Sequence, residues 1–274
     1  MSERVAVRKT YKLFIGGKFP RSESGRSYLV QDANVSLASR KDARDAVVAA
    51  RAAVKGWAGA TAYNRGQILY RAAEMLEGRR EQFVALGVPG DEVDAAVDRW
   101  VWYAGWSDKL AQVYGGANPV AGPYFNLSAP EPTGVVAVVA PERPALLGLV
   151  SVIAPAIVTG NTVVVATSPT EPLAAVTLAE VLATSDLPGG VVNLLTGRIT
   201  ETAPTLAAHM DVNAIDLTGV TDAELAADLE VKAAANLKRV LRPAPADHDW
   251  FADPGLGRMT TLLETKTVWH PKGV

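Results

Sequence analysis

The residue types that catalysis and metal binding most often use are scarce and scattered in this sequence of 274 residues. It contains no cysteine, so these residues can build no disulfide, thiolate metal site or thiol nucleophile. Of its three histidines, His209 follows a helical pattern, where a polar C-terminal residue is common, and His270 lies near the last residue. The third, His248, stands between Asp247 and Asp249 in a proline-rich stretch, where adjacent side chains cannot converge on one ion. A solvated loop is therefore favoured over a metal site.

Common catalytic and nucleotide-binding motifs are absent as well. The sequence has no Walker A loop, no G-x-G-x-x-G and no H-E-x-x-H. Glu142 and Arg143 form the only charged pair in a loop that follows a predicted buried strand, and a salt-bridged surface turn is favoured over catalysis there. Four aromatic residues could stack a ligand, but their helical spacing favours packing: Trp100, Trp102, Tyr103 and Trp106.

Charge and hydropathy narrow the classes of partner. With 27 basic and 29 acidic residues the formal net charge is −2, and the basic residues are not clustered, so neither nucleic acid nor a membrane surface is an expected partner. The longest apolar stretch, 144–158, is too short to span a bilayer and is interpreted as a buried helix. The first ten residues lack the apolar segment of a signal peptide, so a cytoplasmic protein is expected.

Two kinds of pattern divide the chain into an N-terminal and a central part. Residues 12–20 predict a β-hairpin arm that turns at Gly16-Gly17, and apolar residues at helical spacing predict helices over 39–57, 62–76 and 93–110. From Gly134, strands and helices alternate: strands at 135–139, 162–166, 191–195, 214–217 and 237–241, with helices at 146–158, 172–185, 203–209 and 221–236. This alternation predicts an α/β fold, a Rossmann-like open parallel sheet with flanking helices. Ligands would then bind in the loops after the strands.

The boundaries of these elements carry their own signals. Pro172 opens a helix at its first position, and Thr221 to Glu224 is interpreted as a capping box. After Arg242 the regular pattern stops, so 243–259 is interpreted as a surface linker. Residues 260–274 form a C-terminal tail that contains one more strand.

Several strings resemble aldehyde dehydrogenases. They cover most of the chain in order: 13–18 (LFIGGK), 38–42 (ASRKD), 62–66 (AYNRG), 132–141 (PTGVVAVVAP), 153–156 (IAPA), 159–164 (TGNTVV), 187–197 (LPGGVVNLLTG), 218–219 (TG) and 263–268 (LETKTV). The resemblance implies a coenzyme-binding domain over 1–242, with an N-terminal hairpin and an oligomerisation strand near 120–132. It also implies that 260–274 is an oligomerisation tail.

The resemblance fails where the family does its chemistry. The family's nucleophile is a cysteine in a separate catalytic domain, which the sequence lacks. Its general-base glutamate lies in a Glu-Leu-Gly-Gly stretch after the fifth strand, where this chain reads Leu241-Arg242-Pro243-Ala244. Its oxyanion asparagine belongs in a Pro-Trp-Asn turn, which here is Pro141-Glu142-Arg143, so an amide donor is replaced by a cation. No catalytic residue is assigned, and we expect the chain not to act as an enzyme.

The family's coenzyme contacts are also altered. The Lys-Pro-Ser-Glu loop that holds the adenosine ribose aligns with Ala166, Thr167, Ser168 and Pro169. After Thr218-Gly219, the family's serine is Val220 and its glycine one turn later is Glu224, which places negative charge where a pyrophosphate would bind. The vestigial cofactor positions are thus Arg143, Ala166, Pro169, Gly219, Val220 and Glu224. We expect no cofactor, or weak NAD binding.

Three functions are consistent with this pattern. The first is a non-catalytic subunit that assembles with a full-length NAD-dependent aldehyde dehydrogenase and stabilises or regulates it. It rests on the retention of 263–268 while the catalytic domain before it is missing. The second is an oxidoreductase that acts on aldehydes with NAD(P), and the third is a nucleotide or small-molecule sensor that uses the old coenzyme cleft. A decayed gene product without a role is the remaining alternative.

Overall fold

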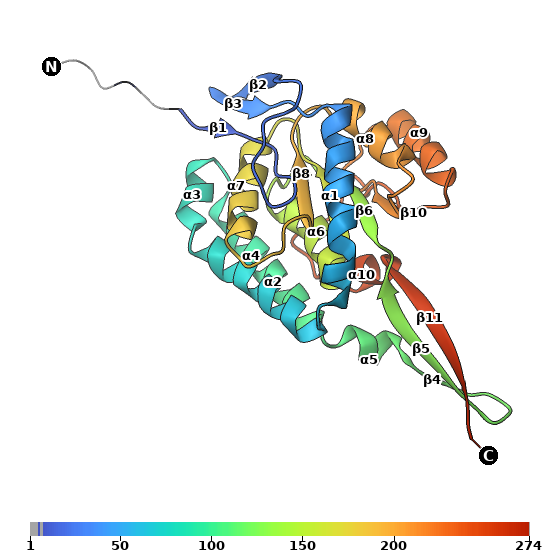
Figure 1. Cartoon of the computed structure of the whole chain (residues 1–274). Helices are drawn as coiled ribbons and strands as arrows, with labels where there is room; N and C mark the ends of the chain where they lie inside the picture. Colours follow the sequence, from blue (N-terminus) through green and yellow to red (C-terminus); the bar gives the residue numbers. More distant parts are fainter. Residues whose placement is uncertain (1–4, 6–7, 274) are drawn as a thin grey trace.

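The core of the molecule is a five-stranded parallel sheet, as the alternating pattern predicts. The computed structural model describes residue 5 and residues 8–273 (Figure 1). The strands lie in the order β10-β9-β6-β7-β8, all parallel. Their bounds are β6 (Val135–Val139), β7 (Thr162–Ala166), β8 (Val192–Leu195), β9 (Ala214–Asp216) and β10 (Arg239–Leu241). The predictions for the first two of these strands are confirmed residue for residue.

Helices cover both faces of this sheet. One face carries α1 (Arg40–Gly59), α8 (Ile199–Ala208) and α9 (Ala223–Ala234); the other carries α2 (Ala62–Glu77), α4 (Gly90–Trp106), α6 (Leu147–Val158) and α7 (Pro172–Ala183). The strand β6 is buried on both faces. Val135, Ala137 and Val139 pack on the face that carries α1, α8 and α9, and the alternate residues Val136 and Val138 pack on the face that carries α2, α4, α6 and α7. A short α3 (Arg80–Ala85) links α2 to α4.

The N-terminal segment forms the predicted hairpin, but the hairpin packs against the sheet and does not project as an arm. Ile15 and Lys18 exchange backbone hydrogen bonds of 3.0 and 3.1 Å across a tight turn at Gly16-Gly17, and the N–H of Leu13 donates to the carbonyl oxygen of Pro20 at 3.1 Å. Phe14 pairs with Leu194 of β8, and both Leu13 and Phe14 are buried against the sheet. The preceding and following residues form a separate small sheet of β1 (Thr10–Tyr11), β3 (Ala33–Ser36) and β2 (Ser27–Val30).

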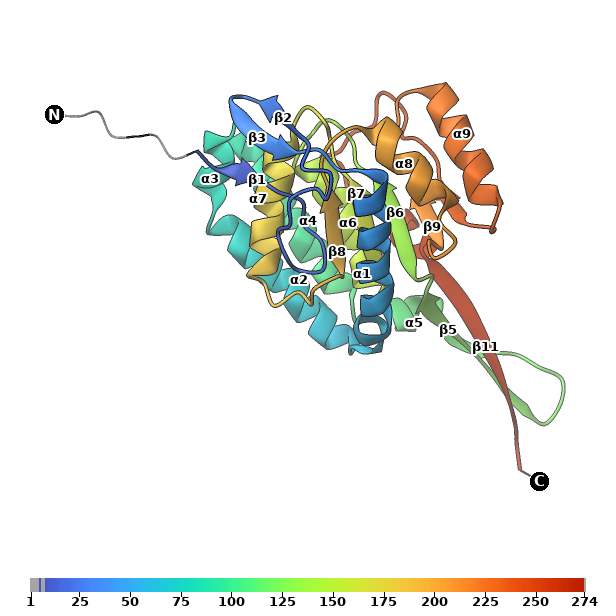
Figure 2. The same cartoon turned by 45° about the horizontal axis from the view of Figure 1, so that its top comes forward.

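A second three-stranded sheet projects from the body as an arm (Figures 1 and 2). It consists of β4 (Gly116–Asn118), β5 (Tyr124–Pro132) and β11 (Leu263–Pro271). The short helix α5 (Leu110–Tyr114) precedes β4, and α10 (Gly257–Thr261) precedes β11. The strand β11 is antiparallel to β5 along its whole length, from Leu263 opposite Pro132 to Pro271 opposite Tyr124. The predicted strand near 120–132 and the predicted C-terminal strand are thus partners.

The segment between β10 and β11 is more ordered than the predicted surface linker. It contains α10, and its Met259 and Leu262 are buried in the core beside α6. The side chain of Arg99 on α4 donates hydrogen bonds to the carbonyl oxygens of Trp250 and Ala252, at 2.8 and 3.0 Å. Residues 242–262 therefore close one face of the domain, which their proline-rich composition does not reveal.

None of the helices in the described residues is long and apolar enough to cross a membrane. The apolar stretch at 144–158 contributes α6, whose twelve residues are all buried, in agreement with the predicted core helix.

Candidate functional site: the carboxyl edge of the parallel sheet

The loops after β6, β7 and β9 meet at the carboxyl edge of the sheet. In the sheet, β7 lies on one side of β6 and β9 on the other, so the direction in which strands are added reverses beside β6. The carboxyl end of β6 is therefore at the topological switch point, where open α/β sheets bind ligands. All six positions that the sequence marks as former cofactor contacts lie here, in these loops or at the start of α9: Arg143, Ala166, Pro169, Gly219, Val220 and Glu224. What this edge of the sheet can bind depends on the side chains in its loops.

The loop after β6 is a salt-bridged surface turn, as predicted. The guanidinium of Arg143 lies 3.2 Å from the carboxylate of Glu171, and its side chain is 81% exposed. The carboxylate of Glu142 accepts a hydrogen bond from the hydroxyl of Thr170. Both charged residues thus tie this loop to the loop after β7.

Polar groups in the loop after β7 are used internally. Ser168 Oγ accepts hydrogen bonds from the backbone N–H groups of Thr170 and Glu171, at 3.3 and 3.0 Å. The hydroxyl of Thr167 donates to the carbonyl oxygen of Leu195 at 3.2 Å. Ala166 is 1% exposed and offers only a methyl group. This loop therefore has no free amine or carboxylate for a ribose.

Backbone packs against backbone where the loops after β6 and β9 meet. The N–H of Gly219 donates to the carbonyl oxygen of Val139 at 3.0 Å, and a Cβ at Gly219 would lie 2.1 Å from the carbonyl oxygen of Ala140. Only glycine fits there. The neighbouring Val220 is 5% exposed and belongs to the apolar core under α1, α8 and α9.

The N-terminus of α9 is already occupied by the chain's own carboxylates. Asp222, rather than the predicted Thr221, is the N-cap: its Oδ1 accepts from the N–H groups of Glu224 and Leu225, at 2.9 and 3.2 Å. Glu224 is exposed in the first helical turn. Two negative side chains thus stand where the helix dipole would otherwise favour a phosphate. The residues of this edge do not fit the pyrophosphate of a dinucleotide.

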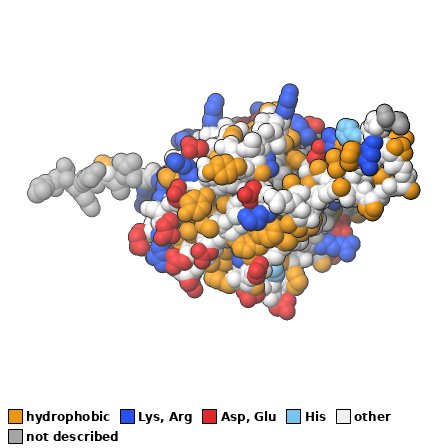
Figure 3. Space-filling model, turned by 90° about the horizontal axis from the view of Figure 1, so that it is seen from below, with side chains coloured by type: hydrophobic (Ala, Val, Ile, Leu, Met, Phe, Trp, Pro, Cys, Tyr) orange, Lys and Arg blue, Asp and Glu red, His pale blue; other side chains and the backbone are white. Residues whose placement is uncertain are grey.

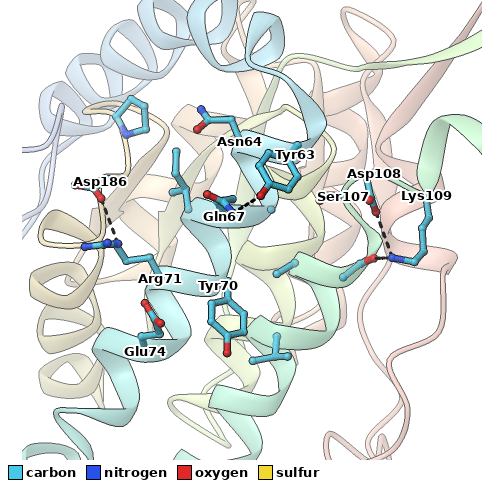
Figure 4. Close-up of a pocket in the computed structure, with 16 residues that line it drawn as sticks. Tyr63, Asn64, Gln67, Tyr70, Arg71, Glu74, Ser107, Asp108, Lys109 and Asp186 are labelled. Carbon is cyan, nitrogen blue, oxygen red and sulfur yellow. Dashed lines mark hydrogen bonds and ion pairs between the residues drawn. The ribbon is translucent and has the colours of Figure 1, made fainter.

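A larger hollow lies elsewhere, between α2 and α4 (Figure 4). It has a volume of about 830 Å³ and is an open groove. Its polar side chains pair with one another: Gln67 donates to the hydroxyl of Tyr63 at 2.8 Å, and Arg71 lies 3.3 Å from Asp186. None of the six former cofactor positions lines this groove.

The histidines and the aromatic cluster behave as structural residues. His209 is the C-cap of α8, and burial lowers its pKa from the ordinary value. His270 is exposed on β11, and His248 packs edge-on against Trp250. The described part of the chain holds no group of three or more side chains that could bind a metal ion. The aromatic residues of α4 pack as predicted: Trp100 and Tyr103 are fully buried, and Trp102 meets Tyr103 edge-on at 4.9 Å.

Several buried polar residues have no signal in the sequence. The carboxylate of Glu92 on α4 accepts from the N–H groups of Leu146 and Leu147, at 2.6 and 3.1 Å, and so caps α6. Asp216, at the end of β9, is 2% exposed and pairs with Arg258 of α10 at 3.0 Å. Arg99 is 7% exposed. Their partners lie far away in the chain, so no local spacing predicts these contacts.

Comparison with known proteins agrees with this architecture. The aldehyde dehydrogenase family profile matches residues 31–242. The chain belongs to the aldehyde dehydrogenase family. It is 31% identical over 252 residues to retinal dehydrogenase 2 of Homo sapiens, covering 85% of this chain and 48% of that protein. It is 32% identical over 248 residues to the mitochondrial benzaldehyde dehydrogenase of Antirrhinum majus, covering 84% and 46%.

The solved aldehyde dehydrogenases show the same fold. The NAD+ complex of aldehyde dehydrogenase from Bacillus cereus superposes with a TM-score of 0.79 at 27% identity, covering 85% of this chain and 50% of that one. The structure of PnpE from Pseudomonas sp. WBC-3 superposes with a TM-score of 0.80 at 27% identity, with the same coverage. The chain thus spans about half the length of the aldehyde dehydrogenases it matches.

Proposed function

We propose that this chain is a non-catalytic subunit of the aldehyde dehydrogenase family, which assembles with a full-length NAD-dependent aldehyde dehydrogenase and stabilises or regulates it. The observation that carries the proposal is the projecting arm of β4, β5 and β11, whose surface is only partly covered by this chain. The altered carboxyl edge supports the non-catalytic part.

Both faces of the arm expose apolar side chains. Directly opposite residues of antiparallel strands point to the same face, so Leu127 shares a face with Val268, and Trp269 shares the other face with Asn126. Phe125 and Leu127 are 56% and 45% exposed on the first face, and Tyr124 and Trp269 are 41% and 57% exposed on the second, although Asn126 between them is buried. Figure 3 shows hydrophobic side chains gathered on the projecting arm beside basic ones. An apolar sheet face in water favours coverage by another protein surface.

The arm also offers a free edge. In the order β11-β5-β4, the nine-residue β11 is an edge strand, and β4 covers only three residues of β5. Unpaired backbone groups along such an edge can add a strand from another chain. The resemblance to aldehyde dehydrogenases implies that the arm of one subunit extends the catalytic-domain sheet of its neighbour. In this chain 242–262 lead directly from β10 to β11, so a second copy offers no such sheet before its β11. A partner that contains such a sheet is the better fit.

Co-expression with a full-length aldehyde dehydrogenase of the same organism, followed by size-exclusion chromatography and native mass spectrometry, tests the proposal. We expect a hetero-oligomer that Leu127→Asp weakens, because a charge then enters the apolar face. Leu29→Asp is the matched control, since Leu29 is 70% exposed on β2, away from the arm. A chain that stays alone with every such partner, or that oxidises aldehydes with NAD on its own, contradicts the proposal.

A further inference from the structure

A small cavity between α4, α6 and the segment 242–262 contains a buried arginine that forms no ion pair with the described residues. The cavity has a volume of about 50 Å³, lies away from the arm and borders the loop after β9, because its lining residue Arg258 binds Asp216 and Thr218. Its polar lining residues are Arg99, Tyr103, Ser151, His248, Asp249, Asp253 and Arg258. Six of its ten lining residues come from 248–254, the part of the chain that leads to α10.

Arg99 is the centre of this cavity. Its guanidinium donates to Ser151 Oγ at 2.9 Å and to the two carbonyl oxygens of Trp250 and Ala252. A guanidinium has five N–H groups, so part of its donor capacity has no partner within the described chain. Among the described residues no carboxylate lies within ion-pair distance of Arg99, although the residue is 7% exposed. A buried, unpaired cation is unfavourable unless a counter-charge is supplied.

A second buried donor faces the same space. Tyr103 is fully buried, its hydroxyl has no hydrogen-bond partner, and burial raises its pKa to about 12. The charges of Arg258, Arg99, Asp253 and Asp216 all act on this hydroxyl, and Tyr103 lines the same cavity as the two arginines. A buried hydroxyl without a partner is uncommon and destabilising, so an acceptor is missing at this point.

The carboxylates of the lining do not supply that acceptor. Asp249 and Asp253 are exposed to solvent, and each spends one oxygen on its own loop, on the N–H of Phe251 at 2.9 Å and of Gly255 at 2.8 Å. Arg258 is committed to Asp216 through one nitrogen, which also donates to Thr218 Oγ1 at 2.8 Å. The inner wall of the cavity therefore presents mainly donors.

We propose that this cavity binds one small monocarboxylate of formate size, held by Arg99 and by the hydroxyl of Tyr103. A carboxylate brings both a negative charge in contact with Arg99 and oxygens that accept in the plane of a guanidinium. A single water molecule needs a cavity of roughly 10–15 Å³, so a cavity of about 50 Å³ holds only a few heavy atoms. The bound anion ties α4 to the segment that closes the domain, so its binding stabilises the folded chain.

Thermal unfolding of the full chain tests this site, with sodium gluconate replaced stepwise by sodium formate at constant ionic strength. Gluconate is too large for the cavity, so we expect a saturable rise of Tm with formate. Tyr103→Phe should raise the formate concentration at half-saturation about tenfold or more, because it removes one hydrogen bond to a charged group. The exposed Tyr63→Phe is the matched control and should leave that concentration unchanged.

Three outcomes overturn the proposal. One is a Tm that is the same in formate and gluconate. A second is a saturable rise that neither Tyr103→Phe nor Ser151→Ala alters; the latter also serves if Tyr103→Phe fails to fold. Saturation by chloride but not by formate likewise contradicts a carboxylate site. These results are independent of the assembly experiment, because neither the cavity nor its variants lie on the arm.

Discussion

The ion pair between Arg258 and Asp216 should contribute more to the free energy of unfolding than an exposed ion pair of similar length, because Asp216 is buried. Arg258→Met keeps a long apolar stem but removes the partner of a carboxylate that is 2% exposed. Breaking a buried pair costs roughly 3–5 kcal/mol, and we place this variant at the low end, about 3 kcal/mol. The reason is that Asp216 keeps the N–H of Thr218 at 2.8 Å, and the Arg258 side chain is 19% exposed.

A matched control separates burial from distance. Arg239 and Glu264 also form a pair, at 2.6 Å, but their side chains are 39% and 49% exposed. Arg239→Met should therefore cost no more than about 1 kcal/mol. For a chain of this size, about 3 kcal/mol corresponds to a loss in Tm of roughly 6–10 °C. Urea and thermal unfolding of both variants measure the difference, and Asp216→Asn in the Arg258→Met background should recover part of the loss. If Arg258→Met costs no more than Arg239→Met, the anchoring of 242–262 through this pair is refuted.

Three further predictions concern other parts of the chain. Glu92→Ala should lower the free energy of unfolding by about 2–4 kcal/mol, measured by urea denaturation, because two buried N–H groups of α6 lose their acceptor; a loss below 1 kcal/mol would contradict this role. Asp222→Ser combined with Glu224→Gly should strengthen any NAD binding by up to about tenfold in calorimetry, since two negative charges leave the start of α9; equal or weaker binding would show that these charges are not the obstacle. The hydrogen bond from Arg239 lowers the pKa of Glu264. The pair therefore stabilises the fold at pH values above the ordinary pKa of glutamate, and this contribution is lost as the pH falls through the lowered pKa. In Arg239→Met, the acid limb of the profile of unfolding free energy against pH should flatten slightly.

Much of the fold could be predicted because its signals are local. Val135–Val139 and Thr162–Ala166 are β-branched runs between turn residues, and the structure has strands there with the same bounds. The hairpin at 12–20 is present, but it is not a projecting arm, because the tertiary contact of Phe14 with Leu194 holds that segment against the sheet. The predicted cap of α9 was wrong by one residue: the capping-box spacing to Glu224 favours Thr221, whereas the carboxylate of Asp222, itself a suitable cap, accepts the hydrogen bonds at the start of the helix.

The sequence predicted where the six former cofactor positions lie in the fold, but not which contacts their side chains make. The resemblance locates Arg143, Ala166 and Glu224 at the carboxyl edge, where the structure has them. Sequence spacing could not show that Arg143 pairs with Glu171, or that Arg99 holds the carbonyl groups of 250 and 252. Such contacts join residues more than twenty positions apart, and they depend on how the layers pack.

The central claim is that the chain works as a non-catalytic partner of a full-length aldehyde dehydrogenase, and native mass spectrometry of the co-expressed pair tests it most directly. The account predicts a defined hetero-oligomer that the native chain and Leu29→Asp form equally well, and that Leu127→Asp forms weakly or not at all. Only separate masses of the two proteins, or a complex that Leu127→Asp leaves intact, would contradict it.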